Sequence, residues 1–106
     1  MKLYINTASQ KTIILELKDN AKVIGRLHFD AEYKQAEKLL PAIEILLKQK
    51  QRTLKDIKSI IVENRGEGFT SLRIGVATAN ALIFALGLPG ILVSPAYSRE
   101  PSVTLK

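Results

Sequence analysis

The stretch IIVENRGEGFTSLRIGVATA, residues 60–79, contains the pattern that decides the fold. The stretch begins within Lys58–Glu63, a β-branched run that is typical of a strand buried at the centre of a sheet. A glycine-containing loop, Asn64–Gly68, comes next, and Thr70 then caps a helix that we expect from about Ser71 to Leu86. A buried strand that leads through a loop into a helix indicates an α/β fold.

The chain before this unit is predicted to contain three antiparallel strands. Leu3–Ile5 forms the first, Lys11–Lys18 alternates apolar and polar residues, and Val23–Phe29 runs back after the hairpin signal Asp19-Asn20. After Phe29 the apolar residues recur with the period of a helix that extends to about Leu47.

The predicted fold class is therefore α/β, with the order β-β-β-α-β-α-β, a mixed five-stranded sheet and two main helices. The first helix is expected to continue through Pro41, the second to stop at Gly87, and Ile91–Val93 to form the fifth strand. This order is the ribonuclease H-like plan, one half of the actin-like ATPase architecture. Residues 1–94 are expected to form a single domain, followed by a polar tail at 95–106.

Composition excludes several classes of function. The 106 residues include no cysteine, which excludes a disulfide framework and a thiolate zinc site. The start of the chain turns polar too early for a signal peptide, and the apolar stretch Val76–Leu92 is interrupted by polar residues, glycine and proline, which argues against a membrane span. We therefore predict a cytoplasmic protein that does not enter a membrane.

Net charge is +6, which favours contact with nucleic acid or with an acidic partner. Basic residues concentrate between positions 48 and 58, where Asp56 is the only acid. The alternative interpretation is a solvated helix end and loop, with two of the lysines beside the negative end of the helix dipole. The possible nucleic-acid contacts are Lys48, Lys50, Arg52, Lys55 and Lys58.

No residue pattern predicts catalysis, a metal or a cofactor. A two-metal nuclease needs several converging acids, whereas the first strand ends in Asn6 and only Glu37 and Glu63 are candidates. His28 is the only histidine and has no second ligand nearby in the sequence. The loop Gly66-Glu67-Gly68 is either a phosphate cradle or a hinge, and its glutamate favours the hinge.

The second helix is rich in small residues, which leave two of its sides flat. Flat sides allow another helix to approach closely and to gain dispersion contacts along a seam. Two interpretations remain: packing within the molecule, or a surface for a second chain. The small residues are Gly75, Ala77, Ala79, Ala81 and Ala85.

Gly68–Ala79, which reads GFTSLRIGVATA, resembles the signature of the TsaB (YeaZ) family, usually written GPGSFTGLRIGVATAKGLA. Glu37–Pro41 and Ile5–Thr7 are similar to further motifs of that family, in the same order along the chain. The sequence departs from it at Asn6, where the family has Asp, and at Gln35-Ala36, where it has His-Ser. Family members are about twice as long and carry a second domain that has no counterpart here.

The resemblance implies a non-catalytic scaffold subunit of tRNA threonylcarbamoyladenosine synthesis. In TsaB-like proteins the two helices of the N-terminal domain pair with the catalytic subunit TsaD, or with a second TsaB, as a four-helix bundle. The resemblance therefore implies a TsaD-like partner and a homodimer in isolation, with tRNA contacted indirectly or weakly. The alternative function is a stand-alone basic module that binds tRNA or other nucleic acid.

Carried over to this sequence, the resemblance predicts which residues contact the partner. Arg73 could pair with a partner carboxylate, and the alternative is an ordinary surface arginine. Glutamate at Val76 or Ala79 is expected to weaken the contact. The predicted partner-contact residues are Glu37, Leu40, Ile43, Leu72, Arg73, Val76, Ala79, Asn80 and Ile83.

Overall fold

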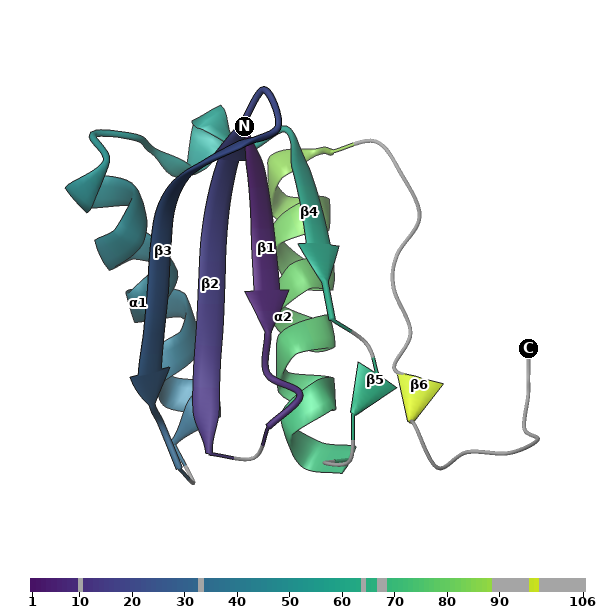
Figure 1. Ribbon diagram of the computed structural model, residues 1–106. Helices are drawn as coiled ribbons and strands as arrows, with labels where there is room; N and C mark the ends of the chain where they lie inside the picture. Colours follow the sequence, from purple (N-terminus) through teal and green to yellow (C-terminus); the bar gives the residue numbers. More distant parts are fainter. Residues whose placement is uncertain (10, 33, 64, 67–68, 89–95, 98–106) are drawn as a thin grey trace.

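The computed structural model describes residues 1–9, 11–32, 34–63, 65–66, 69–88 and 96–97. Within them a four-stranded sheet carries both main helices on one face (Figure 1). The elements are β1 (Lys2–Asn6), β2 (Thr12–Asp19), β3 (Lys22–Asp30), α1 (Gln35–Gln49), the 3₁₀ turn η1 (Leu54–Asp56), β4 (Ser59–Val62), β5 (Arg65–Gly66), α2 (Phe69–Leu86) and β6 (Ala96–Tyr97).

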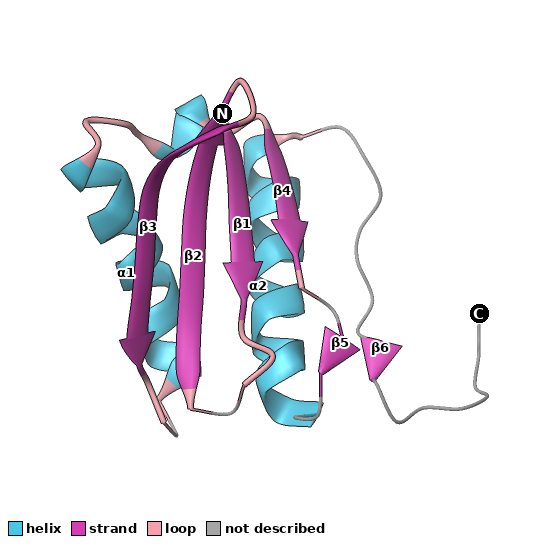
Figure 2. Cartoon of the chain, in the orientation of Figure 1, coloured by secondary structure: helices cyan, strands magenta, loops and turns pink. Residues whose placement is uncertain are grey.

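The sheet order is β3-β2-β1-β4, with β1 antiparallel to β2 and parallel to β4 (Figure 2). This arrangement confirms the mixed α/β fold with a three-stranded meander and two main helices. The predicted fifth strand, Ile91–Val93, lies outside the described residues. A separate parallel pair joins β5 to β6, which the sequence did not indicate, because Asn64–Gly68 was expected as a loop and 95–106 as a tail.

The hairpin between β2 and β3 turns at Asn20 and Ala21, one residue later than the signal Asp19-Asn20 suggests. Both residues have positive φ angles, 54° and 68°, as the two central residues of a type I′ turn require. Such a turn matches the right-handed twist of the strands, which explains why alanine is tolerated there despite its Cβ. The pairing of β2 with β3 shifts register between Leu17 and Lys18, just before the turn.

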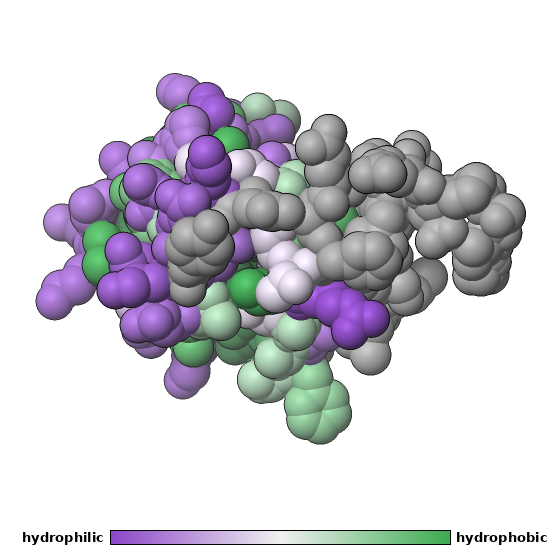
Figure 3. Space-filling view, turned by 90° about the horizontal axis from the view of Figure 1, so that it is seen from below, coloured by the Kyte–Doolittle hydropathy of each residue, from purple (hydrophilic) through white to green (hydrophobic). Residues whose placement is uncertain are grey.

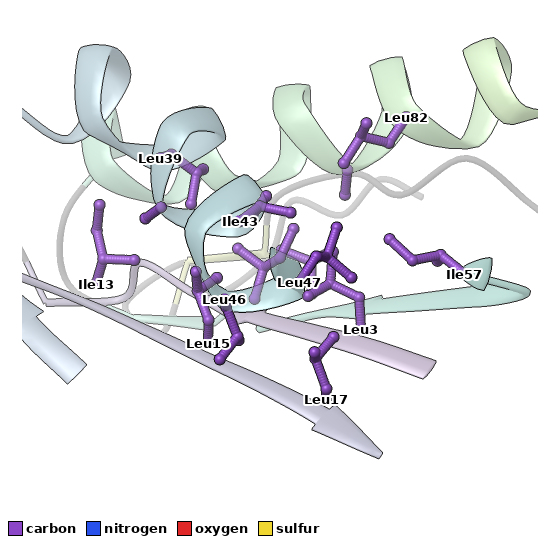
Figure 4. Packing of buried hydrophobic residues seen from close by; sticks show 14 of the residues in the cluster. Leu3, Ile13, Leu15, Leu17, Leu39, Ile43, Leu46, Leu47, Ile57 and Leu82 are labelled. Carbon is purple, nitrogen blue, oxygen red and sulfur yellow. The ribbon is translucent and has the colours of Figure 1, made fainter. Parts of the chain in front are cut away.

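The core lies between the sheet and the two helices. Alternate residues of β1 and β2 point into it, since the period of a strand places every second side chain on one face. Figure 4 shows these sheet residues directed toward the leucines and isoleucine of α1. The fully buried core side chains include Leu3, Ile5, Ile13, Leu15, Leu17, Leu39, Ile43 and Leu46.

Both helix ends follow local sequence rules. α1 continues through Pro41 and ends where Gln51 takes a positive φ, with the Arg52 N–H donating to the Leu47 carbonyl at 2.8 Å. α2 stops before Gly87, whose φ of 64° suits glycine, and the Leu88 N–H donates to the Ile83 carbonyl at 3.0 Å. The predicted stop at Gly87 is confirmed.

Two buried polar side chains fix the helices to the sheet. Thr7, directly after β1, donates its hydroxyl to the Ser71 carbonyl at 2.6 Å. Gln35 opens α1 and donates its amide Nε2 to the Ser9 and Thr12 carbonyls at 2.8 and 2.9 Å. Buried polar groups cost free energy unless they are bonded, so these contacts define where each helix begins.

Gly75 is where α2 comes closest to the sheet. A Cβ placed on it would lie 2.5 Å from the Thr7 Oγ1 atom and 3.4 Å from Val62. Only glycine therefore permits both the close approach of the helix and the Thr7 hydrogen bond.

We predict that Gly75→Ala destabilises the domain by about 1–3 kcal/mol, because the added methyl displaces Thr7 or the helix. Urea unfolding followed by circular dichroism measures the change. At an unhindered helix position the same substitution stabilises by roughly 0.5–1 kcal/mol, so a more stable variant would contradict the close approach. The control Ala77→Ser, on the exposed side of α2, should stay within about 0.5 kcal/mol.

Candidate partner interface

The outward faces of α1 and α2 form the helix surface, which no other described element covers (Figure 1). Three large apolar side chains stand on it: Phe84 is 86% exposed, Ile45 53% and Leu40 44%. In Figure 3 the helix layer lies along the lower edge, where green, apolar side chains gather. Exposed apolar side chains grouped on one face are typical of a surface that another chain covers.

Exposed small residues flatten α2 beside this apolar group. Ala77, Ala81 and Ala85 all face outward and stand four apart, so they line one side of the helix. Gly75 and Ala79, the other small pair, face the sheet and are buried. The two flat sides predicted from the sequence therefore have different roles: one packs inside the molecule and one remains open.

Five of the nine predicted partner-contact residues lie beneath the helix surface. They are covered by the chain's own sheet and neighbouring helix, so they support the surface rather than form it. Four of them lie on α2, where the sequence could not separate them from the open side, because α2 is apolar on most of its circumference. These five are Ile43, Leu72, Val76, Ala79 and Ile83.

The other four predicted residues reach the outside. Glu37 and Leu40 are exposed on α1, Arg73 is exposed near the start of α2, and Asn80 is half-buried farther along it. Sequence reasoning missed Phe84 and Ile45, which are the most exposed large apolar residues of the two helices. For Ile45 a signal was present, since it lies outside the apolar stripe that α1 directs at the sheet. For Phe84 there was none, because α2 is apolar on most of its circumference.

A shallow apolar groove of about 320 Å³ runs between β3 and α1. Leu27 and Phe29 of the edge strand form one wall, and Pro41, Ala42 and Ile45 of α1 form much of the other. Glu37 and Lys38 complete the lining. The groove shares Pro41 and Ile45 with the helix surface, so the apolar area continues around α1 toward the sheet edge.

The two acids considered for metal chemistry do not meet. Glu37 lies on α1, whereas Glu63 follows β4 and interacts with Tyr4 on the opposite face of the sheet. Within the described ranges, no three His, Cys, Asp or Glu side chains gather in a way that could hold a metal ion. His28 is exposed on the edge strand β3, paired across the sheet with Ile14.

Tyr4 is the centre of a polar group on the open face of the sheet. Its hydroxyl accepts a hydrogen bond from the Asn6 Nδ2 atom at 3.1 Å. Burial raises the pKa of Tyr4 above 10.0, the Asn6 hydrogen bond lowers it, and the nearby Glu63 and Glu16 carboxylates raise it further. Tyr4 therefore stays neutral at physiological pH.

The predicted basic run, positions 48–58, lies at one end of the molecule. Lys48 and Lys50 close α1, Lys55 lies in η1, and Lys58 precedes β4. Arg52 donates to the Asp19 carboxylate of the β2–β3 hairpin at 3.3 Å. The loop Gly66-Glu67-Gly68 is described only at Gly66, which belongs to β5.

No described helix is both long enough and apolar enough to cross a lipid bilayer.

Comparison with known proteins gives both a family and a fold. Residues 29–97 match the sequence model of the family described as "TsaD: tRNA N6-adenosine threonylcarbamoyltransferase". No protein of curated function matches the chain at a significant level.

Two solved structures share the fold, each with a TM-score of 0.76 and 24% sequence identity: YeaZ from Pseudomonas aeruginosa, and an uncharacterized protein from the same organism with similarity to peptidase YeaZ. The alignments cover 88% of this chain but only 43% and 42% of those proteins, so the chain spans less than half of their length. The resemblance to the TsaB (YeaZ) family drawn from GFTSLRIGVATA is confirmed at the level of the fold.

We predict that Val76→Glu and Ala79→Glu unfold the domain or cost about 3–5 kcal/mol, because each places an unpaired charge in the core. Ala81→Glu, on the open side of α2, should stay within about 0.5 kcal/mol of the parent. Urea titration of the three variants measures this difference. Equal stability of all three would mean that α2 is rotated about its axis relative to the sheet.

The raised pKa of Tyr4 predicts a loss of stability at alkaline pH. The stability associated with the neutral phenol is complete below the unfolded pKa near 10 and is lost as pH rises through the higher folded pKa. Tyr4→Phe should remove this part of the pH dependence. Unfolding measured from pH 8 to 11.5 tests it, and identical profiles for parent and variant would contradict the assignment.

Proposed function

This chain belongs to the TsaD: tRNA N6-adenosine threonylcarbamoyltransferase family, and from that premise we propose that it is a non-catalytic, TsaB-like scaffold. It dimerises, or docks a TsaD-like catalytic subunit, for threonylcarbamoyladenosine modification of tRNA in the cytoplasm. The proposal places residues 1–94 in one ribonuclease H-like domain. The observation that carries it is the exposed helix surface, on a fold shared with part of YeaZ.

The helix surface has the composition of a docking site. Phe84 projects from α2 and can fill a pocket as an aromatic anchor, the kind of residue that contributes most to interface energy. Ala81 and Ala77, about one and two turns before it, allow a partner helix to approach closely. Leu40 and Ile45 add exposed apolar side chains on α1, with Ile45 on the side that faces β3. A two-helix surface of this kind suits a bundle with two further helices.

Charged residues at the edge of this surface can orient the partner. Glu37 is exposed in the first turn of α1, and Arg73 in the first turns of α2. Because they carry opposite charges, they favour one orientation of a partner over its reverse. Charges at an interface rim typically affect orientation and association rate more than affinity.

The proposal assigns no chemical step to this chain. Asn6, at the end of β1, already uses both ends of its amide: Nδ2 donates to Tyr4, and Oδ1 accepts from the Ala8 N–H at 2.8 Å. An amide in this role stabilises the turn after β1, and it lacks the negative charge that a catalytic metal requires.

We predict that Phe84→Ala weakens self-association, or binding to a TsaD-like subunit, by about 30-fold or more. This corresponds to about 2 kcal/mol, the loss typical of a central aromatic anchor. Analytical ultracentrifugation over a range of concentrations measures self-association, and calorimetry with the purified TsaD-like subunit measures binding to it. Because Phe84 is almost fully exposed, the variant should retain the parent's stability.

The matched control is Ile61→Ala. Ile61 is also large, apolar and exposed, at 46%, but it lies on the sheet face away from the helices. The control should bind like the parent. Equal losses for both variants, or a parent chain that stays monomeric and does not bind the subunit, would contradict the scaffold proposal.

A further inference from the structure

Basic residues from three separate parts of the sequence meet at one end of the domain. The segments are residues 1–2 at the start of β1, 18–22 around the β2–β3 hairpin, and 48–58 from the end of α1 to β4; together we call them the basic pole. Figure 1 shows this end uppermost, with the N-terminus, the hairpin and η1 close together. The sequence indicated only the third segment.

Specific contacts hold the three segments together. The Lys58 N–H donates to the Met1 carbonyl at 2.8 Å, which joins the third segment to the first. Arg52 pairs with Asp19 at 3.3 Å, which joins it to the hairpin. The stem of Lys50 lies against Gly25 of β3, where a Cβ would meet its Cε atom at 2.9 Å. The lysines are therefore presented by a fixed framework rather than by independent loops.

The pole contains all the excess charge of the protein. Its three segments include eight basic and two acidic residues, a net charge of +6, whereas the rest of the chain has eight of each and is neutral. Both acids are engaged: Asp19 accepts from Arg52, and Asp56 accepts from the Thr53 N–H at 2.8 Å. Among the described residues, no ion pair joins a carboxylate to the seven lysines Lys2, Lys18, Lys22, Lys48, Lys50, Lys55 and Lys58.

Fold stability does not explain this arrangement. The helix dipole favours Lys48 and Lys50 at the end of α1. It does not act on Lys2 and Lys18, which lie directly opposite each other on β1 and β2. Like charges in that position repel and destabilise a sheet. The fold does not require this charge repulsion, so the arrangement points to a polyanionic partner whose binding offsets it.

We propose that the basic pole binds the phosphate backbone of RNA, with tRNA as the first candidate because the family is named for tRNA modification. Seven of the eight cations are lysines, which act as point charges on phosphate, and the single arginine is already paired. None of the described pole residues is aromatic, so the pole offers no ring for base stacking. Recognition is therefore of charge along a backbone and not of base sequence.

The test compares two triple variants that remove the same charge from opposite ends. The pole variant is Lys22→Gln/Lys55→Gln/Lys58→Gln, and the control is Lys11→Gln/Lys34→Gln/Lys38→Gln, at exposed positions near the start of β2 and α1. Fluorescence anisotropy with unmodified tRNA from 25 to 300 mM salt measures affinity, and circular dichroism checks that each variant is folded.

For the parent we expect a slope of log affinity against log salt between about −3 and −6, since each neutralised phosphate contributes nearly one unit. The pole variant should lose about 10- to 100-fold in affinity at 50 mM salt and about two to three units of slope. The control should change affinity less than about threefold, and an unrelated RNA of equal length should bind like tRNA.

Several results would overturn the proposal. They are equal losses in both triple variants, no binding of the parent at 25 mM salt, or binding to phosphatidylglycerol vesicles that exceeds binding to RNA. The RNA-binding proposal rests on the proposed function only for the choice of tRNA. Each of the two proposals can therefore fail while the other stands. At chain concentrations too low for self-association, Phe84→Ala should leave RNA binding unchanged, and the pole variant should leave docking of a TsaD-like subunit through the helix surface unchanged.

Discussion

The approach of α2 to β1 at Gly75 and Thr7 is the constraint on which the rest of the structure depends. Thr7 is fully buried, and its hydroxyl is satisfied by the Ser71 carbonyl only because Gly75 leaves room for it. This contact fixes the rotation of α2 about its own axis. Once the rotation is fixed, Val76 must face the sheet and Phe84 must face outward, so the composition of the helix surface follows from one small contact.

The sequence predicts the elements well because their signals are local. The alternation in residues 11–18 predicts β2, and the glycine at position 87 predicts where α2 stops, since each depends on neighbours only a few residues away. The hairpin was placed one residue early because an Asn-Ala pair at positive φ is rarer than the Asp-Asn signal beside it. The local sequence predicted the turn but not which two residues lie at its centre.

The interface residues could not be assigned from the sequence because their side of the helix depends on contacts distant along the chain. Thr7 meets Ser71 across 64 residues, and Gln35 reaches Ser9 across 26. α2 is apolar on nearly every side, so periodicity alone cannot distinguish Ala79, which is buried, from Ala81, which is exposed. The prediction of the basic pole was incomplete for the same reason, because Lys2 and Lys18 join it only through strand pairing.

The helix surface and the basic pole meet only at the C-terminal end of α1, and this determines how their ligands interact. The surface extends along α1 and α2 as far as Phe84 in the last turn of α2, whereas most of the pole lysines stand on β1, the β2–β3 hairpin and η1, outside both helices. Two copies joined through the surface bring two net charges of +6 into one particle. If the copies place their poles at the same end, charge repulsion opposes the dimer and bound RNA relieves it, so that RNA and dimerisation strengthen each other. If the poles lie at opposite ends, that repulsion is largely screened over the distance between them and the two events are independent.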